Sequence, residues 1–136
     1  MKRYEDLERD DGTVVRYRRH QNGDGLVAAG AQVAASAYVA PSAWVDPGVE
    51  VGADVRIGEH CWLEPGAKVQ PGAQLGTHVH VGRGAVVGAG ARLGSRVSVG
   101  VGAVVEARAV VESETTVPSR AVAHRSSRAS AWTPAA

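Results

Sequence analysis

A six-residue period runs through most of this 136-residue chain and limits what it can fold into. From residue 27 to residue 117, every sixth residue is aliphatic, and the residue two places before each of these is small or β-branched. The aliphatic positions are Val27, Val33, Val39, Val45, Val51, Ile57, Leu63, Val69, Leu75, Val81, Val87, Leu93, Val99, Val105, Val111 and Val117. An unbroken period this short is typical of a parallel β-solenoid, in which each hexad supplies one short strand.

The residue types within a hexad fit such a coil. The small and aliphatic residues point inward, and Gly, Pro, Asp or Glu then turns the corner. Each strand is expected to hydrogen-bond to the same strand one coil above and below. The chain has 17 glycines and no phenylalanine, which fits a narrow interior built from Val and Ala.

Two stretches carry a resemblance to a known family: V-G-A-D-V-R-I-G at 51–58 and L-G-S-R-V-S-V-G at 93–100. They resemble the hexapeptide-repeat, left-handed β-helix superfamily, and the resemblance covers about residues 25–122. It implies an all-β fold, three hexads per coil, a left-handed course and a homotrimer. Members of this superfamily include acyltransferases, nucleotide-sugar acetyltransferases, γ-class carbonic anhydrases and proteins with no known activity.

The hexads divide the chain into three parts. Residues 1–24 lack the repeat and read as two strands around an Asp-Gly turn, which predicts a β-hairpin cap over the open end of the solenoid. Residues 25–122 form the β-helix itself. Residues 123–136 are polar, carry Arg125 and Arg128 and contain no acidic residue, which predicts a flexible tail.

The overall composition excludes several classes of function. The chain has 15 basic and 14 acidic residues, so it lacks the basic excess of a nucleic-acid-binding protein. No apolar run is long enough to cross a membrane, and the first residues lack the apolar segment of a signal peptide. Cys61 is the lone cysteine, so an internal disulfide is excluded. We therefore expect a cytoplasmic protein.

With three hexads per coil, residues 18 apart stack on one another, which turns the sequence into a map of the surface. On one face this stacking brings together His60, His78, His80, Trp62 and Trp44. His60 lies one coil from His78, roughly 4.8 Å along the stack. In an extended strand, H-V-H at 78–80 points both imidazoles to the same side.

Three imidazoles from two neighbouring coils suggest a metal site. Catalytic zinc often has three protein ligands and one open position, so His60, His78 and His80 are candidate ligands for zinc or a similar divalent ion. In γ-class carbonic anhydrases the zinc histidines come from two subunits, and two of them are separated by four residues. This chain has no H-x(4)-H, so it departs from that pattern.

The superfamily resemblance implies a second use of the same patch. Its acyltransferases use a histidine as general base at a subunit cleft, which makes His78 and His80 candidate catalytic residues. Trp44 and Trp62 are then candidate binding residues for an acyl-CoA or acyl-carrier donor. Many such enzymes carry a long loop inserted between hexads, and this chain has none.

Two classes of function therefore remain open. The uninterrupted hexads favour a trimeric scaffold or a module that binds a small molecule. The alternative is an enzyme, either an acyltransferase or a metal-dependent hydratase or hydrolase. Outward-facing valines, namely Val86, Val101, Val104 and Val110, favour self-association in either case because exposed apolar patches tend to mark contacts.

Overall fold

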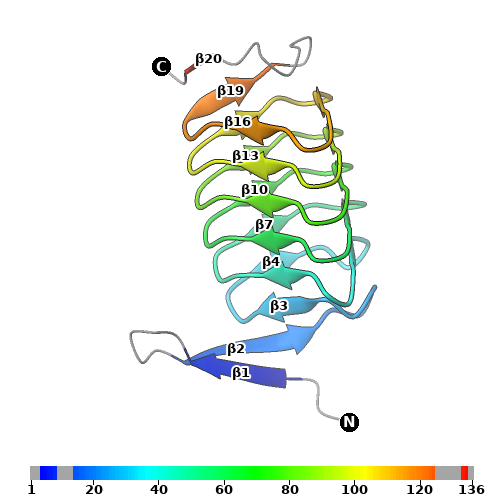
Figure 1. Cartoon of the computed structure of the whole chain (residues 1–136). Coiled ribbons are helices and arrows are strands. Elements are labelled where there is room, and N and C mark those ends of the chain that lie inside the picture. Colours follow the sequence, from blue (N-terminus) through cyan, green and yellow to red (C-terminus); the bar gives the residue numbers. More distant parts are fainter. Residues whose placement is uncertain (1–3, 9–13, 125–132, 135–136) are drawn as a thin grey trace.

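The structure is a computed structural model that describes residues 4–8, 14–124 and 133–134. Its strands stack as successive coils of a parallel β-helix, with the N-terminal hairpin at one end and the last strands at the other (Figure 1). The described residues contain no helix that is long and apolar enough to span a membrane.

Three sheets form the sides of the coil. The sheet of the first face contains, in order, β1 (Tyr4–Glu8), β2 (Val14–Arg19), β3 (Leu26–Ala28), β6 (Trp44–Val45), β9 (Trp62–Leu63), β12 (His80–Val81), β15 (Ser98–Val99) and β18 (Thr116–Val117). The sheet of the second face contains β20 (Thr133–Pro134), β19 (Ala121–Ala123), β16 (Val104–Val105), β13 (Val86–Val87), β10 (Lys68–Val69), β7 (Glu50–Val51) and β4 (Gln32–Val33). The sheet of the third face contains β17 (Val110–Val111), β14 (Arg92–Leu93), β11 (Gln74–Leu75), β8 (Arg56–Ile57) and β5 (Tyr38–Val39).

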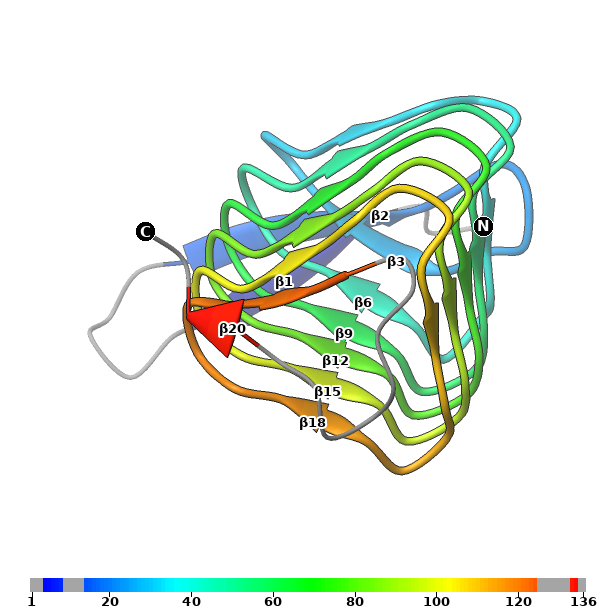
Figure 2. The same ribbon diagram turned by 90° about the horizontal axis from the view of Figure 1, so that it is seen from above.

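The strand pairing follows the predicted period. Trp62 pairs with Trp44 below it and with His80 above it, each in parallel register and 18 residues away. Three hexads therefore complete one coil. Seen from the C-terminal end, the yellow-to-orange chain runs clockwise as it comes toward the viewer, so the coil is left-handed (Figure 2).

The interior is built as the hexads predict. The aliphatic residue of each hexad and the small residue two places before it are buried almost throughout, and together they form one continuous core. The partly exposed exceptions are Ala31 and Val33, in the lowest coil of the second face, and Thr115 near the other end. The outward residue of each strand lies on the surface, because alternate residues of a strand face opposite sides.

The N-terminal strands extend the sheet of the first face. β1 pairs antiparallel with β2, and β2 pairs antiparallel with β3, in the place where the sequence predicts a capping hairpin. Tyr17 and His20 are buried under the lowest coil, where Nε2 of His20 lies 2.9 Å from the carbonyl oxygen of Ala37. The predicted turn between the two strands lies outside the described residues.

The C-terminal end differs from the flexible tail predicted from residue 123. Ala123 is buried and continues the inward column above Val105, so the coil runs one residue beyond the expected end. Thr133 and Pro134 then return as β20, antiparallel to β19. A returning strand satisfies backbone groups that the last strand of a sheet would otherwise expose. The rest of the predicted tail lies outside the described residues.

Candidate functional site

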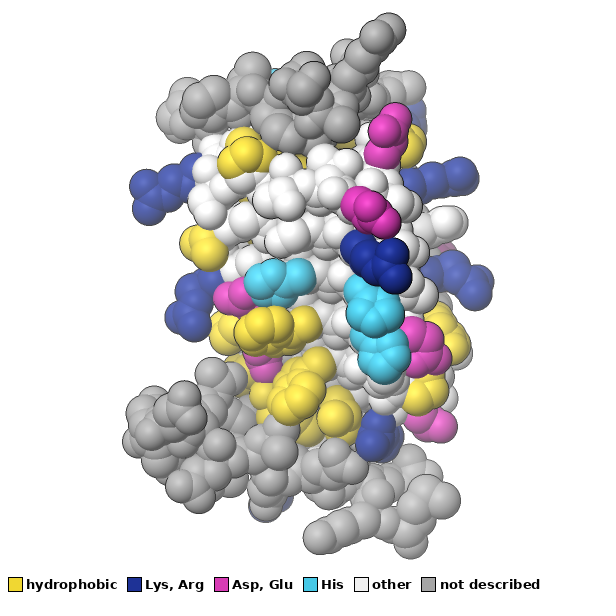
Figure 3. Space-filling model, in the orientation of Figure 1, with side chains coloured by type: hydrophobic (Ala, Val, Ile, Leu, Met, Phe, Trp, Pro, Cys, Tyr) yellow, Lys and Arg dark blue, Asp and Glu magenta, His cyan; other side chains and the backbone are white. Residues whose placement is uncertain are grey.

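A column of aromatic rings stands on the lower half of the first face. Trp44, Trp62 and His80 hold the same outward position on three successive coils. The indole of Trp62 stacks on the imidazole of His80, with ring centroids 4.8 Å apart and an interplanar angle of 23°. Figure 3 shows the histidine side chains on one face beside hydrophobic ones. These rings line a flat surface rather than a closed cavity.

His80 is oriented by a carboxylate. Its Nε2 hydrogen-bonds to the carboxylate of Glu64, so the proton of the neutral ring is held at Nε2. Nδ1 then carries the lone pair, and among the described residues it has no hydrogen-bond partner. The side chain of Glu64 is 18% exposed and that of His80 is 38% exposed, so the pair is half-buried at the surface.

A second carboxylate holds the ring one coil below. Asp46 is only 5% exposed and accepts a hydrogen bond from Nε1 of Trp62 at 2.8 Å. It also accepts one from the hydroxyl of Tyr17 at 2.6 Å. The Asp46–Trp62 and Glu64–His80 contacts both join residues 16 apart. They are therefore the same contact repeated on successive coils, from the residue after one strand to the ring on the next strand up.

The structure separates His60 and His78 from His80. Both lie at the corner that leads into the first face, with φ angles of 59° and 58°. Their rings stack on each other with centroids 4.8 Å apart and an interplanar angle of 30°. The H-V-H segment is therefore not one extended strand: it turns at His78, and only His80 is on β12. The expected common orientation of His78 and His80 fails for this reason.

The three predicted metal ligands are not brought together. His80 faces Trp62 and Glu64, whereas His60 and His78 face each other at the corner. Across the residues that the structure describes, no group of three or more His, Cys, Asp or Glu side chains is placed to hold a metal ion. The patch found in the sequence is thus two neighbouring pairs rather than one triad.

The polar groups around the corner histidines bond among themselves. The hydroxyl of Ser42 donates to the carboxylate of Glu59 and accepts from the backbone N–H of His60. One coil above His78, Arg96 forms an exposed ion pair with Glu114 at 3.3 Å. The corner column therefore presents ionisable groups over four consecutive coils.

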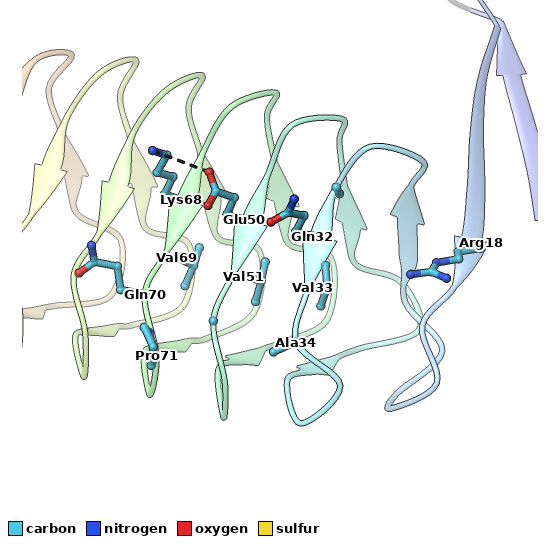
Figure 4. A pocket seen from close by; sticks show the side chains of 12 residues that line it. Arg18, Gln32, Val33, Ala34, Glu50, Val51, Lys68, Val69, Gln70 and Pro71 are labelled. Atoms are coloured by element: carbon cyan, nitrogen blue, oxygen red, sulfur yellow. Dashed lines mark ion pairs between the residues drawn. The ribbon is translucent and has the colours of Figure 1, made fainter.

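Two shallow grooves lie away from these residues. One of about 770 Å³ runs along the second face beside β4, β7 and β10, where Lys68 and Glu50 form an ion pair and Arg18 closes one end (Figure 4). Another of about 450 Å³ lies on the third face between Arg56 and Arg92. Neither groove includes a histidine or a tryptophan.

Cys61 is not a candidate nucleophile. Its side chain is buried behind Trp62, and its Sγ donates to the carbonyl oxygen of Gly76 at 3.0 Å. Burial raises the pKa of this thiol from 9.0 to about 11. The reactive thiolate is therefore scarce at neutral pH, and the residue serves as part of the core.

The residues that complete the site were not selected from the sequence. Glu64, Asp46 and Tyr17 each bond to a predicted ring or to its partner. Spacing is the signal that could have selected Glu64 and Asp46. Each lies 16 residues before the ring that it contacts, which is two residues short of one coil. Tyr17 lies outside the repeat, so no register places it.

The chain was compared with known proteins. Residues 54–89 match the family model described as bacterial transferase hexapeptide (six repeats). A search of curated proteins gave no match. Among solved structures, PerB from Caulobacter crescentus, solved with CoA and GDP-perosamine, is 28% identical, with 71% of this chain and 51% of that chain covered and a TM-score of 0.39.

Two further solved structures are similar. The acetyltransferase domain of PglB from Neisseria gonorrhoeae, solved with acetyl coenzyme A, is 23% identical, with 68% of this chain and 53% of that chain covered and a TM-score of 0.42. LpxA from Acinetobacter baumannii is 11% identical, with 71% and 67% covered and a TM-score of 0.40. This chain spans about half the length of the first two.

The matched repeat, the strand register and the left-handed course agree with one another. The chain carries the bacterial transferase hexapeptide repeat at residues 54–89, and its fold is a left-handed parallel β-helix.

Proposed function

We propose that this protein is an acyltransferase in which His80 acts as general base. The observation that carries the proposal is the Glu64–His80 pair, in which Nε2 is bonded to a carboxylate and Nδ1 keeps its lone pair. A base that is oriented by a third group is the arrangement used to activate a nucleophile. The matched family model is that of a transferase repeat, which agrees with this chemistry.

The proposed reaction uses an acyl thioester donor, as the superfamily resemblance implies. The acceptor's amine or hydroxyl attacks the thioester carbonyl while Nδ1 of His80 takes its proton. The C–S bond then breaks, and the thiolate of the donor leaves and takes the proton from Nδ1 of His80, which restores the neutral base. Glu64 keeps the proton on Nε2 and stabilises the imidazolium that forms. Trp62 and Trp44 supply exposed apolar surface for the donor beside the base.

A transfer assay tests this proposal. Wild-type protein is incubated with acetyl-CoA and a panel of amine and hydroxyl acceptors, and released CoA thiol is measured. Loss of a general base typically lowers the rate by about 10²–10⁴-fold, so His80→Ala is expected to fall in that range and Glu64→Gln to fall less. His60→Ala is the matched control at the corner beside this face. Equal losses in His60→Ala and His80→Ala would contradict the assignment.

A non-catalytic scaffold is the second candidate, because sixteen hexads run without an inserted loop to enclose a substrate. Calorimetry with acetyl-CoA separates the two functions. Absence of both donor binding and CoA release in the wild-type protein would favour the scaffold.

We also propose that the protein assembles as a homotrimer. The support is apolar surface on the upper coils, where Val101 is 48% exposed and Val110 is 60% exposed. Covering these side chains with a second copy removes apolar area from water, which favours association. Light scattering at micromolar concentration tests the assembly, and a monomer would contradict it.

A further inference from the structure

We infer that the N-terminal cap is part of the candidate site, because Tyr17, acting through Asp46, fixes the indole on which His80 stacks. Tyr17 and Asp46 are then positioning residues, which touch neither donor nor acceptor. The effect on catalysis rests on the proposed function, whereas the effect on the orientation of the two rings does not.

Asp46 is the centre of this arrangement. Its carboxylate is nearly fully buried, and each of its oxygens accepts a hydrogen bond from a different part of the chain. Tyr17 donates to Oδ1 from the cap, and Trp62 donates to Oδ2 from the coil above. A buried carboxylate is stable only when it is hydrogen-bonded, and bonds to a charged acceptor are the strong and directional ones. The indole plane of Trp62 is thereby held in one orientation.

That orientation decides how His80 is held. Trp62 is 46% exposed and stands on a flat face, so few packing contacts restrict its side chain. Its stacking on His80 at 4.8 Å therefore depends on the bond from Nε1 to Asp46. The imidazole is then fixed at one edge by Glu64 and on one ring face by Trp62. An indole face also attracts a protonated imidazole, which is the form a general base takes during the reaction.

The cap supplies what the repeat cannot. Asp46 and Glu64 follow their strands at the same hexad position, and one coil lower that position is Ala28. The lowest coil therefore has no carboxylate that could hold Trp44 in the way that Asp46 holds Trp62. β2 pairs with β3 so that Tyr17 lies opposite Ala28, and its ring packs edge-on against Trp44 with centroids 5.3 Å apart. The hydroxyl thus reaches Asp46 from below.

The test compares two variants with two matched controls in the full-length, ¹⁵N-labelled protein. Tyr17→Phe and Asp46→Asn each remove one part of the arrangement and keep the side-chain size. Tyr38→Phe and Asp54→Asn make the same chemical changes on β5 and at another corner, away from the first face. The indole N–H resonance of Trp62 is identified by its loss in Trp62→Phe, and the ring resonances of His80 by their loss in His80→Ala.

We expect Asp46→Asn to shift the indole resonance of Trp62 and to speed its hydrogen exchange about tenfold, since a charged acceptor has been replaced by a neutral one. Tyr17→Phe should shift the same resonance less. Both variants should also move the ring resonances of His80, whereas Tyr38→Phe and Asp54→Asn should leave all of them in place. In the transfer assay, kcat should fall about tenfold in Asp46→Asn while KM changes less, because a mispositioned base slows the reaction step.

Unchanged Trp62 and His80 resonances in Tyr17→Phe and Asp46→Asn would overturn the inference. If Tyr17→Phe does not fold, Asp46→Asn still decides, because it removes the charged acceptor and leaves the indole of Trp62 beside His80 intact. If the resonances move as expected and the wild-type protein transfers no acyl group, the positioning holds and the proposed function fails.

Discussion

Two edges of the solenoid make the same turn with different residues. The first edge is the set of turns that leads into the first face, and the second edge is the set that leads into the second face. At the left-handed position of these turns the first edge has His60, His78, Arg96 and Glu114, with φ between 58° and 66°. At that position the second edge has glycine in five coils, namely Gly30, Gly48, Gly66, Gly84 and Gly102, and Arg120 with a φ of 60° in the uppermost turn.

The difference shows that the first edge keeps its side chains against a backbone preference. A left-handed conformation costs an ordinary residue roughly 1–2 kcal/mol, whereas glycine adopts it freely. The side chains retained at the first edge are the stacked His60–His78 pair and the Arg96–Glu114 ion pair. Strain of this kind gathers at functional sites, and this edge borders the face that carries His80.

The residue that opens each turn directly follows the inward aliphatic residue. At this position glycine is found on the first edge rather than on the second edge of the lower coils. The first edge opens with Gly58, Gly76 and Gly94, each of which lies against the next coil. The second edge opens with Asp46 and Glu64 in the lower coils, and these are the two carboxylates that hold Trp62 and His80. Around Trp62 and His80, side chains thus occupy the left-handed position on the first edge and the opening position on the second, and the first face lies between the two edges.

The largest expected effect comes from a substitution at the residue that opens a turn of the first edge. A Cβ on Gly58 would lie 2.5 Å from the carbonyl oxygen of Gly76, which is backbone and cannot rotate away. We expect Gly58→Ala to lower the free energy of unfolding by about 3 kcal/mol, as overpacking does. Urea unfolding followed by circular dichroism measures it. A loss below that of Gly84→Ala would show that the next coil yields easily.

The buried residue that ends each turn also differs between the two edges. At this position the first edge has Cys61, whereas the second edge has Ala67 and Ala85. Burial raises the pKa of Cys61 to about 11, from an unfolded value of 9.0. Above pH 9 the unfolded thiol loses its proton while the folded thiol keeps it, so stability falls with rising pH until about pH 11. The loss is on the order of 2 kcal/mol.

Cys61→Ala isolates that contribution, because alanine is the usual residue at this place in the hexad. The variant and the wild type are unfolded in urea at several pH values between 8 and 11. The difference between their unfolding free energies should shrink as the pH rises. A constant difference would mean that the thiol titrates alike in both states.

A smaller effect sharpens the comparison at the left-handed position. Gly84 has a φ of 68°, and a Cβ built on it meets no atom within 4 Å. Gly84→Ala therefore tests backbone strain without a clash, and we expect a loss of about 1 kcal/mol. Thermal unfolding measures the change. A neutral result would remove the strain argument from the first edge as well.

The smallest effect should have the opposite sign. His78→Gly relieves backbone strain of roughly 1–2 kcal/mol in the folded state. Glycine also gives the unfolded chain more conformational freedom, which stabilises the unfolded state by about 0.4–1 kcal/mol. We expect the folded state to gain about 0.5 kcal/mol in urea unfolding. A loss above about 1 kcal/mol would show that stacking on His60 outweighs the strain of the turn.

The sequence could predict the coil because each hexad repeats the same physical demand. An inward aliphatic residue every six positions fixes which side of each strand is buried, and sixteen repetitions leave no other register. The exposure of Trp62 and its stacking beneath His80 follow from that register. The column of rings was therefore predictable before the structure.

The chemistry of the site was less predictable for two physical reasons. The strands are only two residues long, so His78 falls on a turn and its direction depends on a φ angle that the repeat does not set. The role of Asp46 depends on Tyr17, which belongs to the cap and follows no period. Residues outside a repeat have no register to place them, and their contacts become visible only in three dimensions.

The 18-residue register has a consequence for how this molecule can be lengthened. A coil bonds only to the coils next to it, so a duplicated coil above Ser98 would leave every contact of the site in place. A coil duplicated between β3 and β6 would instead move Asp46 one coil away from Tyr17. The hydroxyl of Tyr17 would then lose its acceptor, because the residue at the same hexad position on β3 is Ala28 and carries no carboxylate. Coils can therefore be added on the C-terminal side of the site without changing its contacts. On the N-terminal side, the hydrogen bond between Tyr17 and Asp46 fixes the distance from the cap to the site.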